Sequence, residues 1–283
     1  MTEWGHHRQV EIGIGTIDLR TAGPEDGEPI ILLHGFPQTS LSWSGVAPAL
    51  ADAGFRVIAP DQRGYSRGAR PGAVEDYRTD ALADDVLEIA DALGVDGFHL
   101  VGHDWGSSVA WVVAARHSPR LRSLTAVSVP HLAAFGAALE SSSDQQQRSA
   151  YIGLFRRPGK AEEVLLADGA ERLAAMYQGR VPADDVRAYR SLFSEPGALT
   201  AALDWYRAMR SDLSALPAVT VPTTFVWSNA DMAIGREAAE GCAGLVDADY
   251  RFVELDDVTH WIPDQAPDDL TTAILHRTGS TPA

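Results

Sequence analysis

The sequence predicts an α/β protein with a mostly parallel, eight-stranded sheet, helices on both faces of the sheet and an inserted all-helical lid. Through the first 130 residues, strand-like apolar runs alternate with stretches that have helical spacing. From His131 to Leu216 the chain shows helical stretches rich in Ala, Leu, Glu and Arg and no clear strand, and strand-like runs then resume. We therefore expect a core domain over residues 1–130 and 217–283, and a helical cap over residues 131–216.

The individual elements follow from short apolar runs and from helical periodicity. The first two strands are expected to form a hairpin, and the last six residues, TGSTPA, to form a frayed tail. Residues 141–147 are expected to be a loop or a helix start. Strands are predicted at Val10–Ile14, Thr16–Arg20, Pro29–Leu33, Arg56–Ala59, Phe98–Val101, Leu124–Val129, Thr223–Trp227 and Tyr250–Leu255, and helices at Asp76–Leu93, Ser107–Arg116 and Asp268–Arg277.

Composition and charge exclude several classes of partner. The 283 residues are 45% hydrophobic and 22% charged, which suits a globular core that can enclose a dry pocket. The net charge of −16 repels phosphate backbones and anionic lipids, so we expect neither nucleic-acid nor membrane-surface partners. No signal peptide or membrane span is predicted. Cys242 is the single cysteine, which excludes an intrachain disulfide and a cysteine metal site and suits a cytoplasmic location.

The segment Gly102–Gly106, GHDWG, lies between a predicted strand and a predicted helix. This context predicts a nucleophile elbow, a tight turn that lifts its central side chain clear of the sheet. The central residue is Asp104, where an esterase would have Ser. Ser107 and Ser108 lack glycines at the required spacing, so a serine hydrolase is not expected. Taken alone, the segment could equally be an ordinary turn with a capping Asp.

Two further loops supply the partners that an elbow nucleophile needs. Asp231, in WSNADMAIG, and His260, in DDVTHWIPDQAP, each follow a predicted strand. Because the carboxyl ends of parallel strands meet at one edge of a sheet, these side chains are expected to lie together. The chain order of nucleophile, acid and base also fits hydrolases that carry this elbow. The remaining carboxylates of these loops are expected to be surface charges: Asp247, Asp249, Asp256, Asp257 and Asp264.

The loop His34-Gly35-Phe36-Pro37 follows another apolar strand. Its backbone can direct an N–H group toward the elbow. The amides of Phe36 and Trp105 would then form an oxyanion hole. A plain Gly-Pro loop is the alternative.

Together, HGFPQTSLSW, DQRGYS, GHDWG, WSNAD and THWIP resemble the epoxide hydrolase branch of the α/β-hydrolases, over nearly the whole chain. The soluble plant and mammalian enzymes are the most similar in these motifs. The resemblance implies an α/β-hydrolase fold in which Asp104 is the nucleophile, His260 the base and Asp231 the acid that orients it. It implies an enzyme that converts a small-molecule epoxide and water to a vicinal diol through an aspartyl ester, without metal or cofactor. Within these motifs, contacts with substrate are expected from His34, Pro37, Trp105 and Trp261.

The family also carries two lid tyrosines that hydrogen-bond the epoxide oxygen. Tyr206 matches one of them, in the segment Asp-Trp-Tyr-Arg. Tyr151 matches the other, four residues before the Phe of a Phe-x-x-Pro-Gly segment. The resemblance therefore implies that both phenols donate to the oxygen as its negative charge develops. Tyr177 and Tyr189 match neither pattern and are expected to be packing residues.

The expected chemistry has two steps. Asp104 attacks an epoxide carbon from its back side and becomes an ester. His260, expected to be neutral at pH 7, then takes a proton from the water that hydrolyses this ester, while Asp231 holds its tautomer.

Three other functions remain open at this point. A haloalkane dehalogenase shares the Asp nucleophile and a Trp directly after it, but halide leaves without a proton, so HGFP and the tyrosine pair favour the epoxide. A fluoroacetate-type dehalogenase usually has Arg where Trp105 stands. A ligand receptor on this fold can lose members of the triad, all of which are present here. The sequence leaves open the epoxide, its stereochemistry and the oligomeric state, a homodimer included.

Overall fold

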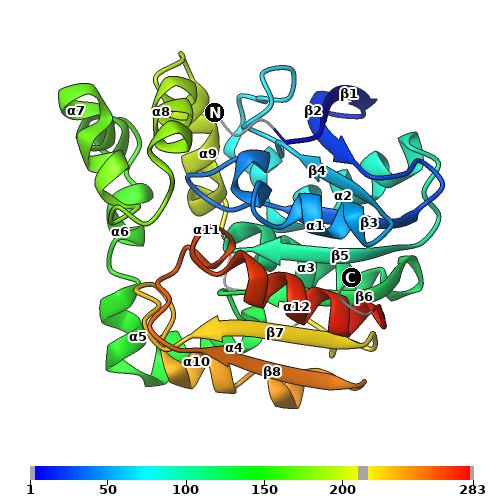
Figure 1. Cartoon of the computed structure of the whole chain (residues 1–283). Helices are drawn as coiled ribbons and strands as arrows, with labels where there is room; N and C mark the ends of the chain where they lie inside the picture. The colour runs from blue at the N-terminus through cyan, green and yellow to red at the C-terminus, as the bar shows by residue number, and fades with distance from the viewer. Residues whose placement is uncertain (1–3, 210–215, 281–283) are drawn as a thin grey trace.

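The structure, a computed structural model, describes residues 4–209 and 216–280 and is built on one eight-stranded sheet (Figure 1). The strand order is β1-β2-β4-β3-β5-β6-β7-β8. β1 and β2 form the predicted hairpin, β2 pairs antiparallel with β4, and the remaining neighbours are parallel, which confirms the predicted sheet. The strands are β1 (His6–Ile12), β2 (Gly15–Ala22), β3 (Glu28–Leu33), β4 (Phe55–Pro60), β5 (Phe98–His103), β6 (Leu121–Val127), β7 (Thr223–Ser228) and β8 (Tyr250–Leu255).

Helices cover both faces of the sheet, as predicted. On one face α2 (Thr79–Ala92) packs against α3 (Trp105–Arg116), and α3 contacts β3, β5 and β6. On the other face α1 (Ala47–Asp52) contacts β4, and α12 (Pro267–Thr278) contacts β6 and β7. The buried apolar side chains accordingly fall into two clusters, one for each face of the sheet. Two packed faces are what allow the parallel strands to be apolar along their whole length.

The helix predicted over Asp76–Leu93 is interrupted at Arg78. This residue is extended (φ −62°, ψ 143°) between a short 3-10 helix, Val74–Tyr77, and the start of α2. The guanidinium of Arg63 donates to the backbone carbonyl of Asp76 just before the break. A contact from a distant part of the chain therefore replaces the helical hydrogen bond that the local periodicity predicts.

Six helices lie within residues 132–207, and we call them the cap helices. The described part of the predicted cap contains helices and turns and no strand. Residues 210–215 of that cap, and 281–283 of the predicted tail, lie outside the described residues. The cap helices are α4 (Leu132–Ser141), α5 (Ser143–Arg148), α6 (Ile152–Phe155), α7 (Lys160–Ala175), α8 (Ala183–Phe193) and α9 (Ala198–Arg207). Helices α5 to α9 lie beyond the carboxyl ends of the parallel strands, whereas α4 runs beside α10 (Arg236–Glu240) (Figure 1).

Tryptophan side chains fix the cap helices to the loops of the sheet. The indole N–H of Trp205, on α9, donates to the backbone carbonyl of Arg63 at 3.1 Å. From the sheet side, the indole N–H of Trp261 donates to the carbonyl of Met176, directly after α7, at 3.2 Å. Each tryptophan thus combines a large buried surface with one directed hydrogen bond, which sets the position of the cap helices over the site.

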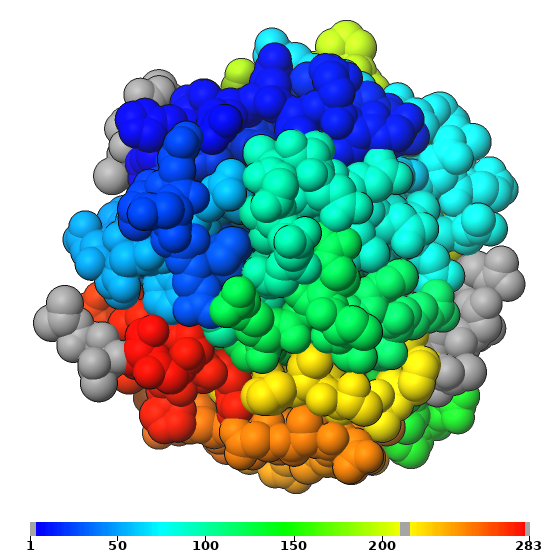
Figure 2. Space-filling view, turned by 90° about the vertical axis from the view of Figure 1, so that its right-hand side faces the viewer, coloured from blue at the N-terminus to red at the C-terminus, as the bar shows by residue number. Residues whose placement is uncertain are grey.

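The cap helices cover only one end of the sheet. Figure 2 shows the other end, where bands from teal through green and yellow to orange follow β5, β6, β7 and β8 in their order in the sheet. Within residues 4–209 and 216–280, each helix is too short or too polar to cross a membrane.

Candidate active site

Asp104 stands at the turn between β5 and α3, with a backbone conformation (φ 53°, ψ −119°) that side chains rarely adopt. The flanking glycines make this turn possible. A Cβ atom on Gly102 would lie 2.2 Å from the carbonyl oxygen of Gly106, and one on Gly106 would lie 2.2 Å from that of Leu33. The predicted elbow is therefore present, and its glycines are required by close packing of the backbone.

The loop after β3 holds one oxygen of the Asp104 carboxylate. The backbone N–H of Phe36 donates to Asp104 Oδ1 at 2.7 Å. A Cβ atom on Gly35 would lie 2.3 Å from the same oxygen, so only glycine lets this loop approach so closely. Trp105 is the first residue of α3, and its N–H has no partner within the helix. The Phe36 amide therefore contacts the Asp104 carboxylate, and the Trp105 amide begins the helix directly after it.

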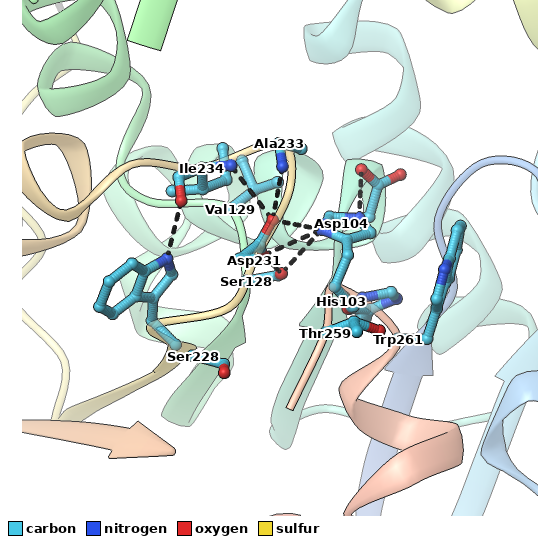
Figure 3. Close-up of polar contacts among 12 residues, drawn as sticks. His103, Asp104, Ser128, Val129, Ser228, Asp231, Ala233, Ile234, Thr259 and Trp261 are labelled. Carbon is cyan, nitrogen blue, oxygen red and sulfur yellow. Dashed lines mark hydrogen bonds and ion pairs between the residues drawn. The ribbon is translucent and has the colours of Figure 1, made fainter. Parts of the chain in front are cut away.

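The imidazole of His260 lies between two carboxylates. These belong to Asp104 and Asp231, and Figure 3 shows Asp231 among the residues that hold it. Its Nδ1 is 3.1 Å and 3.0 Å from the two oxygens of Asp231, and its Nε2 is 3.3 Å from Asp104 Oδ2. Asp231 follows β7, and His260 lies in the loop after β8. The structure therefore brings together the three side chains that the sequence places in three separate loops.

Asp231 is fully buried, and its negative charge is held by several donors. Oδ1 accepts from the backbone N–H groups of Ala233 at 2.8 Å and Ile234 at 3.1 Å, and Oδ2 accepts from the hydroxyl of Ser128. Burial raises the pKa of Asp231, but the charge of His260 and these hydrogen bonds outweigh it and lower the pKa below its ordinary value. Asp231 is therefore a permanent anion beside the imidazole.

The expectation that His260 is neutral at pH 7 is wrong for the free protein. Burial lowers the pKa of His260, but the charges of Asp231 and Asp104 and their hydrogen bonds raise it to about 10. An imidazole between two carboxylates in a dry site keeps its proton because the cation neutralises both anions in part. The neutral form needed for base catalysis requires that one of these negative charges be removed.

Ser128 and His103 belong to the site, although the sequence did not point to them. Ser128 Oγ lies 3.0 Å from His260 Nδ1 and donates to Asp231. His103 Nε2–H donates to the backbone carbonyl of His260 at 2.8 Å, and burial lowers the pKa of His103 to about 4, so this ring is neutral. The strand that is predicted to reach Val129 ends at Val127. Because the prediction places Ser128 inside this strand, it does not identify Ser128 as a residue of the loop.

The two predicted lid tyrosines face the same cavity as Asp104. The rings of Tyr151 and Tyr206 lie 6.2 Å apart, nearly perpendicular to each other. Burial and the charge of Asp104 raise the pKa of Tyr151. Burial is the main cause that raises the pKa of Tyr206, and the nearby Tyr151 and Asp104 add to it. Both phenols are therefore held protonated, as hydrogen-bond donors must be.

A cavity of about 330 Å³ opens between the sheet loops and the cap helices. Asp104, His260, Tyr151 and Tyr206 contribute the polar groups near its buried end, and most of the wall is apolar. A smaller cavity of about 40 Å³ lies on the side of Trp105 and shares Asp104 and both tyrosines as lining residues. The nucleophile and the two phenols thus lie where the two cavities meet. The other lining residues of the larger cavity are Phe36, Leu154, Phe155, Val164, Leu165, Arg172, Ala175, Met176, Met232, Ala233 and Trp261.

Of the four residues expected to contact substrate, Trp105 and Trp261 line these cavities, but His34 and Pro37 do not. The His34 ring is fully buried and accepts a hydrogen bond from the backbone N–H of Gln62 at 3.1 Å. The ring therefore connects two loops behind the cavity. The carbonyl of Pro37 accepts from the Tyr177 hydroxyl. Both residues shape the loop of Phe36 and do not form the cavity wall.

Asp264 is not the surface charge that the sequence suggested. Helix α11 (Ile262–Gln265) turns its carboxylate inward, where Gln38 donates to it at 2.9 Å. Burial raises the pKa of Asp264 to about 7. Tyr177 and Tyr189 are fully buried outside both cavities, as packing residues are. In the part of the chain that the structure describes, no group of three or more His, Cys, Asp or Glu side chains is placed to hold a metal ion.

Comparison with known proteins agrees with this geometry. A family model described as the alpha/beta hydrolase fold matches residues 28–267. An AB hydrolase superfamily protein of Bacillus subtilis, YfhM, is 34% identical over 92% of this chain and 93% of its own length. Epoxide hydrolase A of Mycobacterium tuberculosis is 32% identical over 93% of this chain and 95% of its own length.

Solved structures give the same result. One described among novel epoxide hydrolases from metagenomes of hot environments has a TM-score of 0.87 at 29% identity, covering 97% of this chain and 99% of that one. Epoxide hydrolase A from Mycobacterium thermoresistibile has a TM-score of 0.81 at 26% identity, covering 97% and 98%. The chain therefore belongs to the α/β-hydrolase fold family and, within it, to the epoxide hydrolases.

Proposed function

We propose that this protein converts an epoxide and water to a vicinal diol through an ester on Asp104. The proposal rests on the surroundings of Asp104. Tyr151 and Tyr206 line the same cavity as its carboxylate, and His260 Nε2 lies 3.3 Å from Asp104 Oδ2, the oxygen that Phe36 does not hold. A carboxylate and phenol donors that line one apolar cavity are what opening an epoxide requires. We also propose the division into a core, residues 1–130 and 217–283, and a cap, residues 131–216.

In the first step, an oxygen of Asp104 forms a bond to one epoxide carbon while the bond from that carbon to the epoxide oxygen breaks. Tyr151 and Tyr206 donate to that oxygen as it becomes an alkoxide, and one phenol gives it a proton. Ester formation removes the negative charge of Asp104, which is one of the causes that raise the pKa of His260. The imidazolium therefore releases its proton, which replaces the one that the tyrosine gave up.

In the second step, water attacks the carbonyl carbon of the Asp104 ester. His260, now neutral, accepts the proton of this water, and Asp231 stabilises the imidazolium. The amides of Phe36 and Trp105 stabilise the oxyanion of the tetrahedral intermediate. When the ester breaks, the leaving alkoxide takes the second proton of the attacking water from the new carboxyl group of Asp104, so the diol leaves, Asp104 is again a carboxylate and His260 keeps the first proton. The two steps therefore balance, and they use His260 as an acid before they use it as a base.

A dehalogenase is less well supported. Such an enzyme would hold a halide with the indole N–H of Trp105, whose ring here packs edge-on against Tyr206 with the ring centroids 5.1 Å apart. A leaving halide also needs no proton from Tyr151 or Tyr206. The complete set of Asp104, Asp231 and His260 favours an enzyme over a ligand receptor.

The direct test is to incubate the protein with styrene oxide and a long-chain fatty epoxide and to measure diol, with halide release from a chloroalkane measured alongside. We expect diol and no halide. Halide release without diol would replace the proposal by a dehalogenase, and neither product would favour a receptor.

The remaining proposals concern surroundings and assembly. A chain with one cysteine, Cys242, suits a reducing compartment, so we propose a cytoplasmic location. The net charge of −16 argues against nucleic-acid and membrane-surface partners. A homodimer is the assembly to test, by light scattering.

A further inference from the structure

Arg172 is a charged side chain on the wall of the larger cavity that the proposed chemistry does not use. The charged or titrating groups that line this cavity include Asp104 and His260, which take part in the reaction, and Arg172, on α7. Most of the other lining residues are apolar. A cation on an otherwise apolar wall therefore calls for a separate explanation.

The position of Arg172 is at the open end of the cavity. Asp104, His260 and Tyr206 are buried at one end. Arg172 is exposed to solvent, and so is Met232, with 44% of its surface accessible. A ligand whose epoxide lies against Asp104 would therefore extend along apolar side chains such as Leu165 toward this exposed rim.

The guanidinium of Arg172 forms no ion pair with any carboxylate of the described residues. The adjacent Glu171 pairs instead with Arg190, at 3.1 Å. Two other cap cations are engaged, because Arg148 pairs with Asp144 at 2.7 Å and Lys160 pairs with Glu163 at 3.0 Å. Arg156, Arg157 and Arg180 pair with no carboxylate of the described residues either, but they do not line the cavity. Arg172 is thus free to bind an anion that enters the cavity.

The chain around Arg172 also differs in charge from the rest of the protein. Between Asp144 and Arg180 it carries six basic and five acidic side chains, whereas the whole chain has 23 basic and 39 acidic. The acidic surface of the protein as a whole repels an anionic ligand, and this repulsion is weakest near residues 144–180. Arg156 and Arg157, which follow α6, are exposed on the same stretch.

We infer that Arg172 binds an anionic group at the far end of the substrate, so that the enzyme prefers epoxides that carry a carboxylate at the end of an apolar chain. A guanidinium matches a carboxylate in geometry and can donate two parallel hydrogen bonds to it. The apolar wall accounts for the chain between the two polar ends. This inference rests on the proposed function and adds the substrate class.

The test compares two epoxides that differ only in this charge, 10,11-epoxyundecanoate and its methyl ester. For the acid, Arg172→Gln should raise KM by about tenfold, the effect of one charge-assisted contact at a partly exposed site, with kcat little changed. For the ester, both constants should stay close to those of the wild type. Added salt should raise KM for the acid in the wild type only, because salt screens an exposed ion pair. Arg172→Lys should restore part of the preference.

Arg180→Gln is the matched control, because Arg180 is an exposed cap arginine that does not line the cavity. This variant should keep the wild-type preference for the acid. Equal effects of Arg172→Gln on acid and ester, or a wild type without preference for the acid, would overturn the inference and leave the proposed function intact.

A binding measurement separates the two proposals completely. Calorimetry with 10,11-dihydroxyundecanoate and its methyl ester needs no turnover, so it tests Arg172 even if no epoxide is opened. We expect tighter binding of the acid to the wild type and equal binding of both to Arg172→Gln. Failure of the proposed function would appear instead as absent diol formation from every epoxide, styrene oxide included.

Discussion

The hydroxyl of Ser128 donates to the carboxylate of Asp231 and lies 3.0 Å from Nδ1 of His260. Ser128 is fully buried and has a positive φ of 70°, directly after β6. It therefore occupies a strained backbone position that places its oxygen at the junction of acid and base. This geometry makes Ser128 a positioning residue for the second step, in which His260 must keep its orientation.

Replacing Ser128 by Ala should slow hydrolysis of the Asp104 ester and leave ester formation nearly unchanged. The buried Asp231 loses one donor, which should also lower the free energy of unfolding by about 1–3 kcal/mol. Single-turnover kinetics separates the two steps, and urea unfolding gives the stability. Ser42→Ala is the control, because Ser42 is a buried serine that donates to the carbonyl of Thr39 outside the site. If both variants hydrolyse the ester at the same rate, Ser128 has only a structural role.

Removing the lid hydroxyls should slow the first step. Tyr151→Phe and Tyr206→Phe each delete one donor to the developing alkoxide, and each loss should be on the order of 3 kcal/mol or somewhat less in activation free energy. The double variant should form almost no ester. Stopped-flow measurement of ester formation checks this, with Tyr189→Phe as a control that loses a buried hydroxyl outside both cavities. Full epoxide turnover by the double variant would contradict the assignment of these tyrosines.

The sequence predicts the sheet and the three main site residues because both depend on local patterns. The predicted strands overlap all eight, although β1 begins at His6 and not at Val10, and β6 covers Leu121–Val127 and not Leu124–Val129. Asp104, Asp231 and His260 each follow such a strand. The carboxyl ends of parallel strands must converge, so the order along the chain is enough to bring these loops together.

The features that the sequence does not predict depend on contacts between residues that lie far apart along the chain. The break at Arg78 lies beside a hydrogen bond from the guanidinium of Arg63 to the carbonyl of Asp76. The role of His34 in holding a loop depends on Gln62, which lies 28 positions away. The protonated state of His260 depends on two carboxylates whose separations only the folded chain defines. Local patterns carry none of this information.

The proton on His260 should depend on the charge of Asp104. Asp104→Asn removes one of the two anions that raise the pKa of His260 to about 10, so the pKa should fall in this variant. NMR titration of the His260 imidazole would measure this directly. An unchanged pKa would show that Asp104 does not control the proton, and the proposed use of His260 as acid and then base would lose its basis.

The same interaction has a consequence for stability. The pKa of His260 in the folded protein lies above the value of about 6.5 in an unfolded chain, so its stabilising effect is fully present below about pH 6.5 and is lost as the pH rises toward about 10. The wild type should therefore lose stability relative to Asp104→Asn across this range. Urea unfolding of both proteins at several pH values provides the comparison.

Replacing the base should trap the ester. In His260→Gln the nucleophile and the phenols remain, so the ester can still form once, with solvent in place of His260 restoring the tyrosine proton. The water of the second step, however, has no base. Intact-protein mass spectrometry should show the added mass of one epoxide, on the peptide that contains Asp104. The double variant with Asp104→Asn should gain no mass. An unmodified His260→Gln protein, with substrate binding established, would argue against a covalent intermediate.

Oxygen tracing separates attack by Asp104 from direct attack by an activated water. Both routes give a diol, and both can use His260 as a base, so rate measurements alone do not distinguish them. In the covalent route the new diol oxygen comes from the Asp104 carboxylate, because the ester breaks at its carbonyl carbon, and water oxygen enters the carboxylate. One turnover with excess enzyme in oxygen-18 water should therefore give largely unlabelled diol and a labelled peptide spanning Asp104. Direct hydration would label the diol in the first turnover and leave that peptide unlabelled. That result would remove Asp104 as nucleophile even if the protein opened epoxides, and the short contact between His260 and Asp104 would then have to position a water instead.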